Sequence, residues 1–183
     1  MVAGEASVRR LDHNGGSASF KVRQEPYQGV ARTVEVMRQL ASDGQAHPKV
    51  RRWAEQVVQQ ITPKDHLSEA AAVYYAACRQ VRYTRDPANV EYLQHPSLVL
   101  ENRHGDCDDL GVLLAAALAS VGNDMQFVTV GFKKNGQYTH VFLQMRDPRS
   151  GRMVVLDPVA GPYVGQMLGK VRRHQTYWAS GGR

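Results

Sequence analysis

The chain has 183 residues, of which 43% are hydrophobic and 22% charged, and its formal net charge is +6 at pH 7. This length can bury one substantial core but is short for two full domains, so we expect one domain with extended ends. No stretch reaches the length of a membrane span, and the first residues lack the apolar core of a signal peptide. We therefore expect a protein made in the cytoplasm, with no membrane partner.

The positive charge comes from basic residues that are spread along the chain without interleaved aromatic residues. Such a distribution is typical of a solvated surface, and we do not expect a nucleic-acid partner. The two cysteines, Cys78 and Cys107, have neither CxxC spacing nor a partner histidine pattern. This excludes a recognisable zinc site or disulfide framework and favours a reducing compartment.

The first half of the chain reads as an arm followed by helices. Residues 1–25 are rich in glycine, serine and charge, and we expect an extended N-terminal arm. Apolar residues at helical spacing predict three helices, over 27–41 with an end at Asp43-Gly44, over 48–61, and over 62–81 with Thr62 as its cap. Cys78 falls inside the third helix, where a lone cysteine is typical of a small core residue.

The second half predicts an antiparallel sheet after one more helix. Prolines 87 and 96 interrupt residues 83–103, which we expect to form a long loop, with at most one short helical turn. A helix begins near Cys107. Alternating hydrophobicity then predicts strands over 126–132, 138–145 and 152–158, separated by turns at 133–136 and 147–151. Helices followed by an antiparallel sheet indicate the α+β class.

Cys107 lies at the start of the predicted helix, with Asp106 placed as its N-cap and Asp109 as the cap's partner three residues on. Leucines at helical spacing follow the cysteine on one face, so the thiol should face inward. The unpaired N–H groups and the dipole of a helix start favour a thiolate and can hold an oxyanion. This position suits a nucleophile.

Two polar residues of the predicted sheet could complete a catalytic site. His140 lies in a patterned strand, and Asp157 ends the next one. A turn with an even number of residues, such as 148–151, brings these two side chains together on one face, whereas an odd number separates them. A thiol, an imidazole base and an aspartate that orients the imidazole would form a Cys-His-Asp triad.

The segments GDCDDLGVLLAAALASVG, THVFLQM and VVLDP resemble the three core motifs of the transglutaminase-like superfamily within the papain-like fold, over about residues 83–162. The sequence is similar in particular to bacterial transglutaminase-like cysteine proteinases and to phage and prophage proteins of this type. The resemblance implies Cys107 as nucleophile, His140 as general base and acid, and Asp157 as the orienting residue. It also implies a papain-like core, which we expect over residues 26–165, with a helical part 26–82, a catalytic core 83–165 and a basic C-terminal tail 166–183.

The second oxyanion donor is left open by the sequence. Animal-type transglutaminases use a tryptophan near the cysteine, but the two tryptophans here, Trp53 and Trp178, lie elsewhere. Gln94, Asn102 and Tyr92 in the preceding loop are the candidates.

The three acids beside the cysteine stabilise the helix start by about 0.3–1 kcal/mol each, but they oppose ionisation of the thiol. We expect Asp106, Asp108 and Asp109 to act as caps, without a metal or other cofactor. A calcium site formed by these three acids, as in the periplasmic proteinases that the motif resembles, is the alternative.

The function that fits these residues best is a cysteine-dependent acyl-transfer enzyme acting on a protein or peptide substrate. Hydrolysis by a peptidase or amidase is favoured over cross-linking, because no second site for an acceptor amine is recognisable. The alternative is a structural or assembly protein of a phage particle that keeps this fold, with or without activity. Its N-terminal arm and C-terminal tail would then dock on other phage structural proteins.

Overall fold

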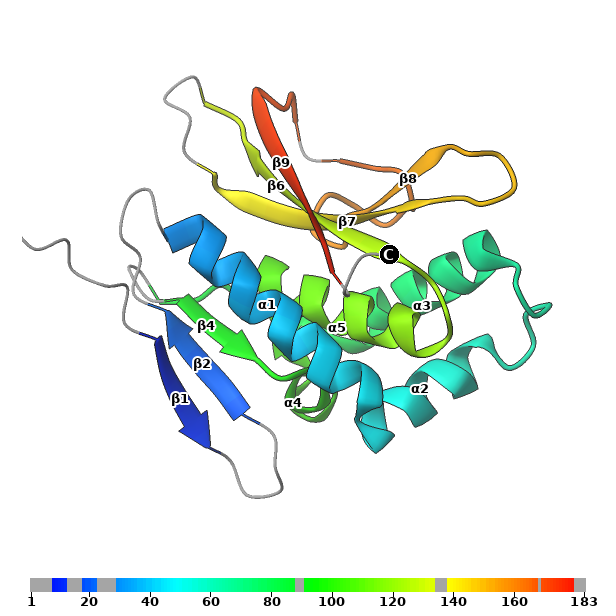
Figure 1. Cartoon of the computed structure of the whole chain (residues 1–183), viewed down its shortest axis with the longest axis horizontal. Helices are drawn as coiled ribbons and strands as arrows, with labels where there is room; N and C mark the ends of the chain where they lie inside the picture. The colour runs from blue at the N-terminus through cyan, green and yellow to red at the C-terminus, as the bar shows by residue number, and fades with distance from the viewer. Residues whose placement is uncertain are drawn as a thin grey trace, which may run out of the picture.

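The computed structural model describes residues 8–12, 18–22, 29–87, 91–133, 138–167 and 169–179. Within these residues a helical layer lies against one face of an antiparallel sheet, and a smaller sheet flanks the helices (Figure 1). None of the helices in these ranges is both long and apolar enough to cross a membrane. The architecture is the predicted α+β class.

The helical layer is built around one buried helix. Its members are α1 (Gly29–Ala46), α2 (Pro48–Val58), α3 (His66–Gln80), α4 (Pro96–Asn102) and α5 (Cys107–Ser120). Residues 108–118 of α5 are all buried, and the other four helices pack around it. A helix that is apolar on every side is stable only when it is surrounded in this way. The cysteine at its first position is thereby attached to the most rigid part of the core.

The main sheet has the strand order β8-β7-β6-β9 and is antiparallel throughout. Its strands are β6 (Met125–Gly131), β7 (His140–Arg146), β8 (Met153–Leu156) and β9 (Arg173–Trp178). Alternate residues such as Phe127 and Leu143 belong to the core cluster that contains α5. The opposite face carries a second apolar cluster around Val130 and Phe142. As predicted, His140 lies on the same face of β7 as Phe142.

Two smaller sheets lie near the start of α5. The strands β1 (Val8–Asp12), β2 (Ala18–Val22) and β4 (Glu91–Gln94) form an antiparallel sheet beside α1 and α4 (Figure 1). The short strands β3 (Arg82–Tyr83) and β5 (His104–Gly105) pair in parallel. Both arrangements fix the segments that lead into Cys107.

Several predicted boundaries are wrong for physical reasons. The first helix continues past Gly44 to Ala46. At Gly44 the helix packs closely on α4, and only a glycine fits because a Cβ would lie 2.6 Å from Pro96 Cγ. The third helix begins after Asp65, not Thr62. The Asp65 carboxylate accepts the N–H of Ser68, while Lys64 adopts a positive φ of 65° just before it.

The described part of residues 83–103 also contains more regular structure than predicted, namely β4 and the seven-residue helix α4. Pro96 is the first residue of α4, where its missing N–H costs nothing, and the ring of His95 caps the helix by accepting the N–H of Ser97. Beyond the main motifs, Arg173–Trp178 of the predicted tail form β9, which pairs with β6. The division into an arm, a domain and a tail stays a prediction from the sequence.

Candidate active site

The start of α5 is closed by its own N-cap. Asp106 Oδ1 accepts the main-chain N–H groups of Asp108 and Asp109, at 3.1 and 3.4 Å. The first-turn N–H that this cap does not take is that of Cys107. The predicted cap is therefore confirmed, and it does not engage the main-chain N–H of Cys107.

Asp109 completes the predicted capping box, because its carboxylate accepts the main-chain N–H of Asp106, and it also reaches β4. Its Oδ1 accepts the N–H of Gln94 at 2.7 Å and its Oδ2 accepts Gln94 Nε2 at 2.8 Å. Burial raises the pKa of Asp109 to about 7, against the effect of these donors. A Cβ on Gly105 would lie 2.6 Å from Asp109 Cβ, so only glycine fits beside this carboxyl group. Asp109 thus joins β4 to the turn that precedes the cysteine.

His140 and Asp157 meet, as the even-numbered turn predicted. Nε2 of His140 lies 2.8 Å from Oδ2 of Asp157, and both side chains are buried. Since a carboxylate only accepts, Nε2 carries the proton in the neutral imidazole and Nδ1 is the nitrogen that can accept one. The ring centroids of Phe132 and Phe142 lie 6.3 and 6.2 Å from the centroid of this imidazole.

The Cys107 sulfur lies beside the start of β7, the strand that carries His140. The main-chain N–H of Val141, the residue after His140, donates to the sulfur. The thiol in turn donates to Asp108 Oδ1 at 3.5 Å. Burial raises the pKa of the Cys107 thiol well above its usual range, and the carboxylates of Asp108 and Asp106 raise it further. The resting group is therefore a thiol, despite its place at a helix N-terminus.

The three predicted oxyanion candidates are engaged in other contacts. The amide of Gln94 donates to Asp109 and to the carbonyl of His104, and its oxygen accepts from Asn102 Nδ2 at 3.0 Å. The main-chain N–H of Tyr92 donates to Asp86. Gln94 and Asn102 thus form a structural network beneath the helix start, and these contacts do not direct the amide of either residue toward Cys107.

Tyr83 is a site residue that the sequence reasoning missed. It pairs in register with Gly105, two residues before Cys107, and its side chain is 40% exposed. Burial raises the pKa of Tyr83, and so does the nearby Cys107, while a hydrogen bond with Arg85 lowers it. Because a guanidinium only donates, Arg85 binds the phenol oxygen and leaves the hydroxyl proton available. Tyr83 comes close to Cys107 through the parallel pairing of β3 and β5. Two-residue strands show no periodicity, so no pattern in the sequence indicated this pairing.

Asp106, Cys107 and Asp108 are the described residues that could together contact a cation. One ligand atom from each lies within 4.8 Å of the others. Calcium prefers oxygen ligands, so the two carboxylates fit it and the sulfur does not. Asp109, the third predicted ligand, is directed to Gln94 and lies outside this group.

Comparison with protein families agrees with this geometry. The family model of the transglutaminase-like superfamily matches residues 51–158, more than half of the chain. The chain belongs to the transglutaminase-like superfamily. The match begins at residue 51, well before the segment of about 83–162 that carries the recognisable motifs, and so includes α3. Among curated proteins, none matches this sequence.

Solved structures show the transglutaminase-like fold as well. LapG of Legionella pneumophila is 17% identical, with a TM-score of 0.51 over 73% of this chain and 76% of LapG, and a calcium-bound form gives the same values. A candidate protease of Parabacteroides distasonis is 10% identical, with a TM-score of 0.50 over 68% of this chain and 26% of that one. These similarities concern the fold. The role in a phage particle stays a prediction from the sequence.

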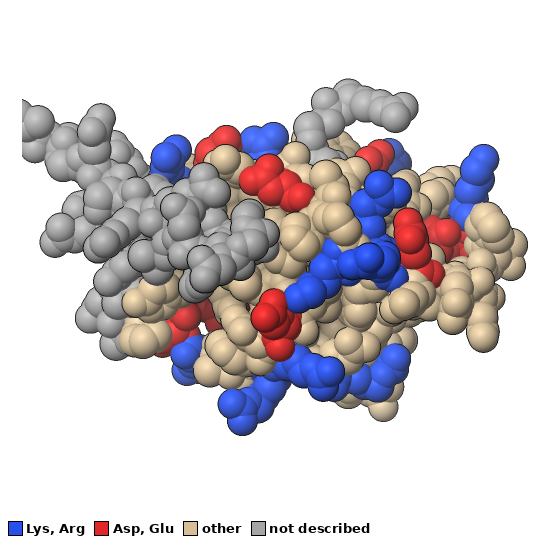
Figure 2. Space-filling model, turned by 90° about the horizontal axis from the view of Figure 1, so that it is seen from below, with Lys and Arg blue, Asp and Glu red and all other residues tan. Residues whose placement is uncertain are grey.

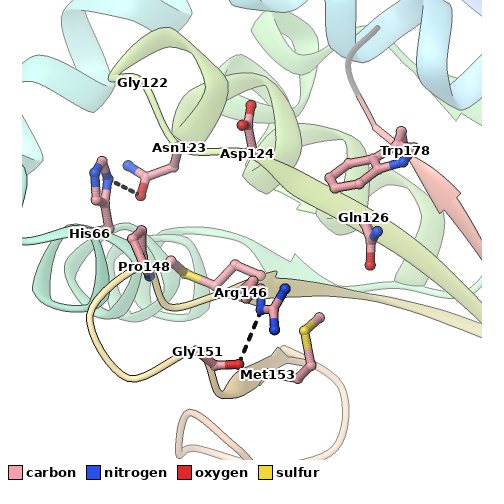
Figure 3. A pocket seen from close by; sticks show the side chains of 11 residues that line it. His66, Gly122, Asn123, Asp124, Gln126, Arg146, Pro148, Gly151, Met153 and Trp178 are labelled. Atoms are coloured by element: carbon pink, nitrogen blue, oxygen red, sulfur yellow. Dashed lines mark hydrogen bonds between the residues drawn. The ribbon is translucent and has the colours of Figure 1, made fainter. Parts of the chain in front are cut away.

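A pocket of this transglutaminase-like domain lies at the opposite end of α5 from Cys107. It encloses about 550 Å³ and is bordered by Asn123, Asp124, Arg146 and Trp178, among others (Figure 3). The Asn123 side chain accepts from His66 Nδ1 and donates to Glu69 Oε2, at 2.9 Å each. Arg146 Nε donates to the carbonyl of Gly151. None of the three predicted catalytic residues lines it.

Charges on the face in Figure 2 are mixed, with basic and acidic side chains side by side. Two basic residues of α2 are paired with acids: Lys49 with Glu101 at 2.8 Å and Arg51 with Glu55 at 3.6 Å. A mixed surface of this kind is typical of solvation and not of polyanion binding.

Proposed function

We propose that this protein is a cysteine-dependent acyl-transfer enzyme that hydrolyses an amide bond in a protein or peptide. One observation carries the proposal. The imidazole of His140 is hydrogen-bonded to Asp157, and the main-chain N–H of the next residue, Val141, contacts the Cys107 sulfur. The proposal assigns Cys107, His140 and Asp157 the roles of nucleophile, base and orienting acid, and these two contacts support it. Membership of the transglutaminase-like superfamily supports the same chemistry.

The reaction begins from a neutral thiol. Nδ1 of His140 takes the thiol proton as the sulfur attacks the carbonyl carbon, and Asp157 stabilises the imidazolium through Nε2. Transfer to the histidine during the attack avoids a free thiolate beside Asp106 and Asp108, which would be costly. The buried acids therefore make the base essential.

The tetrahedral oxyanion is held by two donors in this proposal. The first is the main-chain N–H of Cys107, which the Asp106 cap does not take. The second is the hydroxyl of Tyr83, whose oxygen is bound by Arg85. His140 then returns its proton to the leaving amine, and the carbon–nitrogen bond breaks to give a thioester. Water, deprotonated by His140, hydrolyses the thioester and restores the thiol.

We propose that the carboxylates of Asp106 and Asp108 bind calcium. A calcium-bound form of the structural neighbour LapG exists, and the two carboxylates here lie together. A bound calcium ion would neutralise the charges that raise the pKa of Cys107. Alkylation of Cys107 by iodoacetamide should then be several-fold faster in millimolar calcium than in EGTA. Asp108→Asn should remove this difference, and an identical rate in both buffers would exclude the calcium site.

Amide hydrolysis by the full chain tests the function. Unfolded casein is incubated with the protein, and new amino termini are quantified by mass spectrometry. We expect cleavage by the wild type, none by Cys107→Ala, and wild-type rates for Cys78→Ala. Cleavage that survives in Cys107→Ala would contradict the proposal. A library of short peptides serves as a second substrate, because casein presents only a limited set of sequences.

A further inference from the structure

Tyr74 of α3 connects the helical layer to the turn that carries Asp157. Its side chain is completely buried, and its hydroxyl donates to the carbonyls of Asp157 at 3.1 Å and Gly161 at 2.7 Å. These are the first and last residues of the turn that follows β8. A single phenol in an alanine-rich helix thus binds both ends of this turn.

The turn itself fixes the carboxylate of Asp157. Oδ1 accepts the N–H groups of Val159 and Ala160 at 3.1 and 3.2 Å, which leaves Oδ2 for His140. An aspartate held by local N–H groups keeps one rotamer as long as the turn keeps its shape. The direction of Oδ2 therefore depends on the position of the turn relative to β7, and Tyr74 is the side chain that anchors the turn from the helical side.

Cys78 completes the arrangement one helical turn further on. Its thiol forms a hydrogen bond with the Tyr74 hydroxyl. This contact lowers the pKa of the Cys78 thiol, against the larger effect of burial, which raises it. The ring of Tyr75 contacts Tyr74 edge to face, with centroids 5.3 Å apart, but no hydrogen bond of Tyr75 to the turn is present among the described residues. Tyr75 is therefore a matched control.

We propose that Tyr74 is the positioning residue of the active site: it holds the turn from Asp157 to Gly161 so that the Asp157 carboxylate meets His140 Nε2. The inference rests on the proposed function for its effect on catalysis. The geometric part, the dependence of the His140–Asp157 hydrogen bond on the Tyr74 hydroxyl, stands independently of which reaction the site performs.

The test compares Tyr74→Phe with Tyr75→Phe. An imidazole N–H that donates to a buried carboxylate gives a downfield proton NMR signal, which Asp157→Asn identifies by its loss. We expect Tyr74→Phe to shift this signal upfield or broaden it, and to lower kcat on the order of tenfold to a hundredfold at little change in KM. Tyr75→Phe should leave both readouts at wild-type values.

A folded Tyr74→Phe protein with an unchanged signal and an unchanged kcat overturns the inference. If this variant does not fold, 3-fluorotyrosine incorporated only at position 74 keeps the shape and makes the hydroxyl a stronger donor. The His140 signal should then move, and a signal that stays in place overturns the inference. If the wild type hydrolyses no amide but the signal responds to Tyr74, the proposed function fails while the positioning role of Tyr74 holds.

Discussion

The two ends of α5 differ in what they offer a ligand. At the N-terminal end, Cys107 contacts the main chain of Val141, next to the buried and hydrogen-bonded pair His140 and Asp157. The C-terminal end has a pocket of about 550 Å³, yet two of the polar residues that line it, His66 and Asn123, are hydrogen-bonded to each other, and Asn123 also donates to Glu69. Reactive groups and empty volume are thus separated by the length of the helix.

This difference teaches that volume alone does not locate an active site. A pocket of several hundred Å³ is the usual first hypothesis for a binding site. Here the polar side chains beside Asn123 satisfy each other and stabilise the junction between α3 and β6, whereas we propose proton transfer for the polar groups around Cys107. The following substitutions test this separation, one end of α5 against the other.

The largest effect should come from removing the base. His140→Ala should lower kcat/KM by at least about 1000-fold, because it removes the proposed general base and acid. His66→Ala at the other end should stay within twofold in activity but lose about 1–3 kcal/mol of stability, since Asn123 loses a partner. Activity on casein and urea unfolding measure the two effects. A His66→Ala protein that is stable but inactive would contradict the separation.

Removal of the proposed second oxyanion donor should have an intermediate effect. Tyr83→Phe should reduce kcat on the order of 100-fold with little change in KM, because the hydroxyl acts only on the transition state. Tyr163→Phe, whose side chain is 63% exposed, is the control and should keep full activity. Steady-state kinetics on one peptide substrate distinguish the two. Equal kinetics for both variants would remove Tyr83 from the site.

The smallest effect concerns stability against pH. The pKa of Asp109 is raised from 3.8 to about 7 in the folded state, so the folded protein holds a proton that the unfolded chain releases. Its contribution to stability is present below pH 3.8 and is lost as the pH rises to about 7, with a slope of up to about 1.4 kcal/mol per pH unit. Asp109→Asn should flatten this part of the curve. Asp124→Asn, at the exposed opposite end of α5, should keep the wild-type curve, measured as urea midpoints from pH 4 to 8.

Much of this arrangement could be predicted because it depends on local rules. Period-two alternation predicted β6, β7 and β8, and the even-numbered turn correctly predicted that Asp157 meets His140. The N-cap Asp106 also follows from residue type and position alone. Each of these features is determined by neighbours within a few residues of the chain.

The rest depends on contacts between distant segments. Tyr83 reaches the site through a two-residue parallel pairing, and Tyr74 through bonds to carbonyls more than 80 residues away. Asp109 is a cap as predicted, but its additional contact with Gln94 of β4 was not foreseen. No periodicity in the sequence encodes such contacts. They were therefore missed or misassigned, although they surround the best-predicted residues.

The relative reactivity of the two cysteines tests the central claim most directly. Near neutral pH, the account predicts that iodoacetamide labels Cys107 at least about tenfold faster than Cys78, because the proposed base His140 takes the proton of Cys107 alone, although burial raises the pKa of both thiols. His140→Ala should abolish the difference. Peptide mapping by mass spectrometry gives both rates in one sample, and equal, slow labelling of both cysteines in the wild type would contradict the account.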